Sequence, residues 1–404
     1  MKLTRSLSLF ICFVAFNSYS QPGPPPPMNL NVGHGIGGGI IIDSTTDLRL
    51  IENLRNYHQF SSSLYLIINL PDIPEEFQGF TEIQDLRLVC GKELRSLEKL
   101  NYFPNLHSLY IGNFTGEQLN KAPFKLDSLS LIRIWSCRNL KSIDEFKELQ
   151  KVTKIEILEC PSLTHFPKWA EGNQIRYLDL NNGQGFRQWD NNSKEIARLD
   201  ISNLKHLTKL EEFRLMNYSC FDEVPDCLPQ SVIKLSVMGK GYREGLDNVI
   251  LKNIRNLNLY PNLKEVEFFG LAIREIGGDF KGLSLNQLRF HSIFDLSDIS
   301  DLFTYDSLGI LQINYCPTLK YAQPTETDCI LNRLEMESVN LQDISFLFQC
   351  TGIRELRLTE GLIEMIIPDP ERMKAIPNVL LYSNGGYHLY KENGVWSIWK
   401  MERE

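Results

Sequence analysis

Hydrophobic residues recur at a fixed spacing through most of the chain. In one stretch, relative positions 1, 4, 6, 9 and 12 hold Leu129, Ile132, Ile134, Cys137 and Leu140. The same positions hold, 23 residues later, Val152, Ile155, Ile157, Cys160 and Leu163. Positions 4 and 6 alternate with polar residues, which predicts a short strand with one buried face, and position 9 falls in the turn that follows.

The same register extends over nearly three hundred residues. Position 4 of successive copies is occupied by Leu64, Leu86, Leu109, Ile132, Ile155, Leu178, Phe213, Leu235, Val266, Leu288, Leu311, Leu334 and Leu356. Ten of the twelve steps are 22 or 23 residues, so the pattern predicts a stack of repeats, because one repeat cannot bury its apolar edge alone. The steps of 35 and 31 residues predict insertions after Leu178 and Leu235, unless Leu199 and Leu257 mark two further strands.

This pattern, LxxLxLxx(N/C)xL, resembles the cysteine-bearing leucine-rich repeat and is similar to internalin-like bacterial proteins. The resemblance implies an α/β solenoid, a horseshoe with a parallel concave sheet and short helical or 3₁₀ segments on the convex side. It also implies that Cys137, Cys160 and Cys316, at position 9, are buried and face the backbone of the turn. Repeats of this kind bind many different partners, so the fold does not name the ligand.

Residues 1–20 have the pattern of a signal peptide. Lys2 and Arg5 precede an apolar run that is too short to span a bilayer, and Ser20 ends a small-x-small cleavage site. We therefore expect a protein of the cell envelope or a secreted protein, cleaved after Ser20 and without a membrane span. Lipidation at Cys12 is the alternative.

Residues 21–45 form a Pro/Gly-rich linker. Gly33, Gly35 and Gly38 match GxGxxG, but a proline run precedes them and Ile40–Ile42 follows, so the strand and helix of a dinucleotide loop are missing. A flexible spacer is the favoured interpretation.

Each end of the solenoid, predicted over residues 46–375, is expected to carry a cap. Thr46–His58 has apolar residues at helical spacing, which predicts an N-terminal helical cap. Residues 376–404 contain turn signals at Asn384-Gly385 and Asn393-Gly394 between β-prone residues, which predicts a C-terminal β cap or a small separate β module.

Composition excludes several function classes. The chain has 404 residues, 43% of them hydrophobic, and a net charge of −8, which is typical of a globular protein and unfavourable for sequence-independent nucleic-acid binding. No zinc, nucleotide, hydrolase or EF-hand motif is present. Asp295, Asp298 and Asp301 suggest a cation site, but turn and capping roles are favoured. The sequence therefore predicts no enzyme, no cofactor and no metal, although an insertion or the C-terminal segment leaves room for an active site.

Eight cysteines remain after Cys12. Cys220 and Cys227 are close enough in sequence to close a small loop, and Cys329 and Cys350 precede neighbouring strands. For both pairs, a disulfide and free thiols remain alternatives.

The predicted partner-binding surface is the concave face, where positions 3, 5 and 7 point outward. Mixed charges at position 5 and apolar residues at position 7 favour a protein or peptide partner. The candidate partner-binding residues are Arg87, Tyr110, Arg133, Trp135, Leu158, Arg214, Met216, Met238, Phe269, Arg289 and His291. Two alternatives remain: a glycan stacks on Trp135, Tyr110 and Phe269, or an insertion or the N-terminal cap covers the apolar row.

Overall fold

The structure is a computed structural model of the whole chain. It describes residues 40–49, 51, 62–182, 197–219, 221–239, 251, 253–278, 280–323, 330–348, 353, 355–359, 362, 365, 387–392 and 395–400. The predicted signal peptide, the GxGxxG motif and both insertions fall almost entirely outside these residues.

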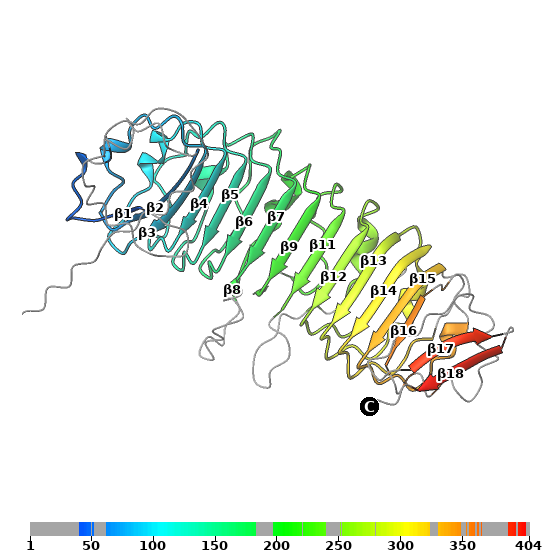
Figure 1. Ribbon diagram of the computed structural model, residues 1–404. Helices are drawn as coiled ribbons and strands as arrows, with labels where there is room; N and C mark the ends of the chain where they lie inside the picture. The colour runs from blue at the N-terminus through cyan, green and yellow to red at the C-terminus, as the bar shows by residue number, and fades with distance from the viewer. Residues whose placement is uncertain are drawn as a thin grey trace, which may run out of the picture.

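One parallel sheet of 14 strands dominates the described chain, with the strands side by side in chain order along the molecule (Figure 1). Its strands are β1 Ile40–Ile42, β2 Ser63–Ile68, β3 Asp85–Cys90, β4 Ser108–Gly112, β5 Leu131–Trp135, β6 Lys154–Leu158, β7 Tyr177–Asn181, β9 Glu212–Met216, β11 Lys234–Met238, β12 Glu265–Phe269, β13 Ser284–His291, β14 Ser307–Asn314, β15 Ile330–Glu337 and β16 Glu355–Leu358.

The predicted register is confirmed from β2 to β16. Each residue predicted at position 4 pairs with the position-4 residue of the next repeat, from Leu64 to Leu356. The sheet also begins earlier than the predicted solenoid, because Ile40–Ile42, within the predicted linker, pairs with β2 as its first strand.

The alternative that Leu199 and Leu257 belong to further strands of the main sheet is wrong. Leu199 follows β8 (Ala197–Arg198), which pairs with β10 (Tyr218–Ser219) in a separate two-stranded sheet. Leu257 lies in a 3₁₀ segment. Both leucines are buried, so their apolar character comes from packing between the sheet and the convex side.

Short 3₁₀ segments on the convex side confirm the second part of the predicted repeat. They are η1 Glu75–Phe77, η2 Glu98–Tyr102, η3 Asp144–Phe146, η4 Ser202–His206, η5 Arg255–Leu259, η6 Ser300–Thr304 and η7 Ser345–Phe348. Just before η6, Asp298 accepts a hydrogen bond from the Ser300 amide at 2.8 Å, which agrees with the favoured turn role of this aspartate.

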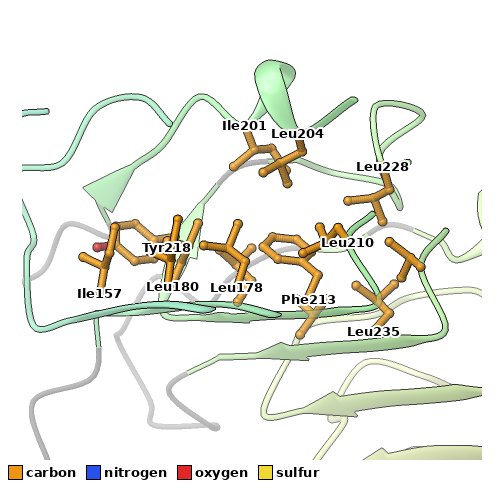
Figure 2. Close-up of a cluster of buried hydrophobic side chains, with 14 of the residues drawn as sticks. Ile157, Leu178, Leu180, Ile201, Leu204, Leu210, Phe213, Tyr218, Leu228 and Leu235 are labelled. Atoms are coloured by element: carbon orange, nitrogen blue, oxygen red, sulfur yellow. The ribbon is translucent and has the colours of Figure 1, made fainter. Parts of the chain in front are cut away.

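The hydrophobic core is a continuous layer between the sheet and these segments. Figure 2 shows Leu178, Leu180 and Phe213 of neighbouring strands facing Ile201 and Leu204 of the convex side. Burial of this layer, repeated along the stack, supplies the main stabilising term of the fold.

A left-handed backbone residue follows most strands, a feature that the hydrophobic pattern did not predict. In seven repeats position 8 is a non-glycine residue with φ between 53° and 59°, and Gly270 takes this place after β12. Most of these residues are Asn or Ser, although Tyr315 is bulky. The turn directs the chain from the sheet toward the buried position 9.

The two ends differ from the repeats. Arg49 and Ile51 are helical and Ile51 is fully buried, whereas residues 52–58 of the predicted N-terminal cap lie outside the described residues. At the C-terminus, β17 (Tyr387–Glu392) and β18 (Val395–Lys400) pair antiparallel, as the Asn393-Gly394 turn signal predicted. No helix within the described ranges has the length and apolar character needed to cross a membrane.

The position-9 cysteines are packing residues. Cys137, Cys160 and Cys316 are fully buried, and each thiol donates a hydrogen bond to the carbonyl two residues earlier, at 3.4, 3.4 and 3.5 Å. Cys227 is half-buried and free, and its thiol lies 3.6 Å from the Ile201 carbonyl, whereas Cys220, its alternative disulfide partner, lies outside the described residues. Cys329 and Cys350 lie outside the described residues.

We expect Cys227 to react with iodoacetamide before the position-9 cysteines do. Burial raises the pKa of Cys316 to about 12 and removes its thiol from solvent, so thiolate chemistry there requires unfolding. Mass spectrometry of alkylated peptides at increasing urea concentration measures the order of modification. Labelling of Cys316 in the folded chain, as fast as that of Cys227, would contradict this assignment.

Candidate functional site

The candidate site is the concave face, which is formed by the outward side chains of β2–β16. Arg87 and Arg289 are exposed, and the other nine candidate partner-binding residues are half-buried at the surface of the sheet. Two other position-5 residues, which are not among the candidates, are more buried than predicted: Glu156 is 7% exposed and Ser236 is 1% exposed. Glu156 forms ion pairs with Arg133 and Lys154, and the Ser236 hydroxyl donates a hydrogen bond to Glu267 on the adjacent strand.

Trp135 occupies space that Gly112 leaves empty on the neighbouring strand. The two residues pair across β4 and β5, and a Cβ atom added to Gly112 would lie 2.2 Å from the Trp135 indole. The indole therefore lies across the sheet surface over β4, because position 7 of that strand carries no side chain. The sequence placed both residues in one row but did not indicate this contact.

A second aromatic group lies farther along the position-7 row. Phe269 stacks on His291, with ring centroids 4.6 Å apart and planes inclined by 16°. His291 also contacts Tyr315, with centroids 5.2 Å apart. Burial lowers the pKa of His291, which favours the neutral ring at neutral pH. Tyr315 was not among the predicted site residues, because it occupies position 8 rather than 7.

Cation–π contacts and ion pairs connect the polar side chains of β3–β6. Tyr110 has two guanidinium groups over its ring, from Arg87 and Arg133, each 5.2 Å from the ring centroid. Arg133 also forms an ion pair with Glu156, which Lys154 approaches to 3.1 Å. Two cations thus share one carboxylate that is 7% exposed.

The network continues across β7, β9 and β11. The Lys154 ammonium and the Arg214 guanidinium lie over the Tyr177 ring, 4.4 and 5.5 Å from its centroid. Arg214 pairs with Glu212 at 2.7 Å, and Lys234 pairs with Glu265 at 3.2 Å. Burial raises the pKa of Tyr177 to about 12, so its hydroxyl stays protonated.

Charged and amide side chains also link β13–β16. Arg289 hydrogen-bonds Gln312, whose amide donates to Glu335 at 2.9 Å. Glu335 also lies 3.0 Å from Arg333 and 3.7 Å from Arg357. Burial opposes ionisation of Glu335, but the hydrogen bonds from Gln312 and Arg333 lower its pKa overall. The polar surface is therefore held in place by its own lateral contacts.

The structure thus brings the candidate residues together as two adjacent rows. The sequence identified the rows, yet it missed the position-3 residues that complete the network, among them Lys154, Tyr177 and Glu212. Complementary charges at positions 3 and 5 of neighbouring repeats were the available signal. Within the described ranges, no group of three or more His, Cys, Asp or Glu side chains is placed to hold a metal ion.

Comparison with known proteins gives one curated relative of modest similarity. A probable disease resistance protein of Arabidopsis thaliana is 27% identical over 309 residues, which cover 72% of this chain and 24% of the relative. The chain thus spans about a quarter of the length of that protein. No protein-family model matches.

Two solved structures are similar to parts of the chain. CroV588, described as a novel circular LRR protein, has a TM-score of 0.27 and 12% identity, covering 80% of this chain and 64% of the other. A leucine-rich repeat protein from Bacteroides ovatus has a TM-score of 0.18 and 11% identity, covering 79% and 83%. The 22- or 23-residue register and its pairing in one parallel sheet give this chain the solenoid fold that leucine-rich repeat proteins have.

Proposed function

We propose that this chain is a secreted, non-catalytic interaction scaffold that binds a protein or peptide on its concave face. Secretion is supported by the charged, apolar and small-residue pattern of residues 1–20. Binding is supported by the surface composition of β2–β12. The leucine-rich repeat fold is compatible with this role and leaves the ligand open.

The observation that carries the proposal is the apolar position-7 row beside a network of ion pairs and cation–π contacts. The inward residues at positions 4 and 6 of the same strands are almost completely buried, whereas the position-7 residues remain partly exposed: Trp135, Leu158, Met216, Met238 and Phe269. Large aromatic and apolar side chains of this kind contribute most of the binding energy at protein interfaces. The neighbouring ion pairs hold their side chains in place, so less conformational entropy is lost on binding.

The carbohydrate alternative depends on aromatic rings whose faces are free. Two guanidinium groups already contact the Tyr110 ring, and His291 stacks on Phe269. Of the three aromatic residues proposed to stack on sugar rings, Trp135 is the best placed to do so, because its neighbour Gly112 has no side chain. We therefore favour a protein or peptide partner, with glycan binding as a measurable alternative.

A peptide-display selection tests this proposal. The full chain is used to select from a random 12-residue library, and each selected peptide is then measured against wild type and Trp135→Ala by biolayer interferometry. We expect selected peptides to bind wild type and to lose at least about tenfold in affinity on Trp135→Ala, as for truncation of a central interface aromatic.

A glycan array probed with the same two proteins provides the second arm. Glycan binding that requires Trp135, together with peptides that bind both proteins equally, would favour the carbohydrate alternative. Equal binding of all ligands by both proteins would show that the concave face is not the binding surface.

A further inference from the structure

We infer that the partner places an acidic side chain on Arg87, next to an apolar side chain that packs on the Trp135 end of the position-7 row. This inference rests on the proposed function and adds the chemistry of the partner. It predicts a peptide segment in which Asp or Glu lies a few residues from an aliphatic or aromatic residue.

Arg87 differs from the other arginines of the concave face in its partners. Within the described residues, Arg87 forms no ion pair with a carboxylate, and its guanidinium lies over the Tyr110 ring instead. Arg133, Arg214, Arg289 and Arg357 each lie within 4 Å of a glutamate: Glu156, Glu212, Glu267, and Glu335 or Glu355.

A carboxylate for Arg87 is close in sequence but is engaged elsewhere. In β9 and β16, Arg214 and Arg357 pair with the glutamate two residues earlier on the same strand, at 2.7 and 2.9 Å. The equivalent residue for Arg87 is Asp85, which accepts a hydrogen bond from the Ser63 hydroxyl at 3.2 Å. Arg87 extends instead toward Tyr110 on the neighbouring strand.

This placement suits recognition of a carboxylate. A guanidinium that lies over an aromatic ring is oriented by that ring while its N–H groups remain available to form two parallel hydrogen bonds. Arg87 is exposed, so the partner reaches it without displacing another side chain. An arginine already paired with a protein carboxylate has fewer N–H groups left for a partner, and its charge is partly neutralised.

The surrounding charges favour an acidic partner as well. At the outward positions of β3–β6, Arg87, Arg133 and Lys154 carry three positive charges against the two negative charges of Asp85 and Glu156, so one positive charge is in excess. The chain as a whole carries a net charge of −8, so this positive region contrasts with the remaining surface. A complementary acidic segment would be steered to the N-terminal part of the concave face.

The strand positions set the spacing that the partner needs. Arg87 lies on β3 and Trp135 on β5, two steps across the sheet, or about 10 Å at the usual strand separation. An extended peptide advances about 3.3 Å per residue, so the acidic and apolar side chains should be about two to four residues apart.

The peptides selected on the wild-type chain test this inference. We expect Asp or Glu to be enriched two to four residues from an aliphatic or aromatic residue, relative to the unselected library. Synthetic versions with amidated C-termini should bind Arg87→Ala at least about tenfold more weakly than wild type, with Arg87→Lys intermediate because lysine lacks the planar fork. Amidation ensures that the side-chain carboxylate, rather than a terminal one, is measured.

Arg357→Ala is the matched control, since it removes a concave-face arginine outside the candidate partner-binding residues. We expect this variant to bind the same peptides as wild type does, and circular dichroism should show that all three variants remain folded. Two outcomes would overturn this inference and leave the proposed function intact. In the first, the selected peptides depend on Trp135 but show no acidic enrichment. In the second, they depend on Trp135 but bind Arg87→Ala and wild type with equal affinity. Peptides that bind independently of both Trp135 and Arg87 would overturn both.

Discussion

Phe213→Ala is expected to lower the free energy of unfolding by about 3–5 kcal/mol, the usual range for truncation of a buried phenylalanine. Phe213 is fully buried at position 4 of β9 and pairs with Leu178 and Leu235 on the neighbouring strands. Its ring lies within the layer that joins the sheet to the convex side (Figure 2). Alanine would leave a cavity between two repeats, because the rigid sheet cannot close around it.

The matched control, Met216→Ala, is three residues later on the same strand. Met216 is half-buried and faces the concave side, so its loss should cost about 1 kcal/mol or less. Urea unfolding followed by circular dichroism, with both variants compared with wild type, measures the difference. Equal destabilisation by the two substitutions would show that the assigned inward and outward positions of β9 are incorrect.

The double variant Trp135→Ala/Phe269→Ala is expected to abolish partner binding, with at least about a hundredfold loss of affinity and little change in melting temperature. Trp135 and Phe269 lie on β5 and β12, separated by four strands of the sheet. Substitutions at such distant sites usually have additive effects, so each single variant should contribute about tenfold. Calorimetric titration with a selected peptide, together with thermal melts, measures both quantities.

Gly112→Ala provides a control that retains the indole but displaces it. The added methyl group would overlap the Trp135 ring, so this variant should also weaken binding and shift the fluorescence spectrum of Trp135. If the single variant Phe269→Ala binds normally, the peptide contacts the N-terminal part of the row alone. Global unfolding of the double variant would instead place the two aromatic residues in the core.

The inward and outward positions of this fold could be predicted from the sequence because each strand repeats the same short alternation. A shift of one residue would expose Leu64, Leu109 and their equivalents, which makes the register strongly specified. For the same reason, the burial of the position-9 cysteines followed once the repeat was identified. The two insertions were located from spacing, although their leucines did not reveal whether another strand was present.

The contacts across the concave face depend on tertiary structure. In the sequence, Asp85 is two residues from Arg87 and Tyr110 is 23 residues from it. Small differences in side-chain geometry decide which of the two Arg87 contacts. The position of the Trp135 indole depends on the strand register and on the absence of a side chain at Gly112.

The sequence by itself determined the repeat, its register and the rows of side chains that face solvent, since periodic burial of apolar residues specifies these features. Only the tertiary structure decided which members of those rows contact one another. Such contacts join residues one repeat or more apart, and alternative pairings of the same side chains differ little in free energy. The hydrophobic pattern of the sequence therefore does not predict which pairing forms. The distinctive partners of Arg87 and Trp135 belong to this second group.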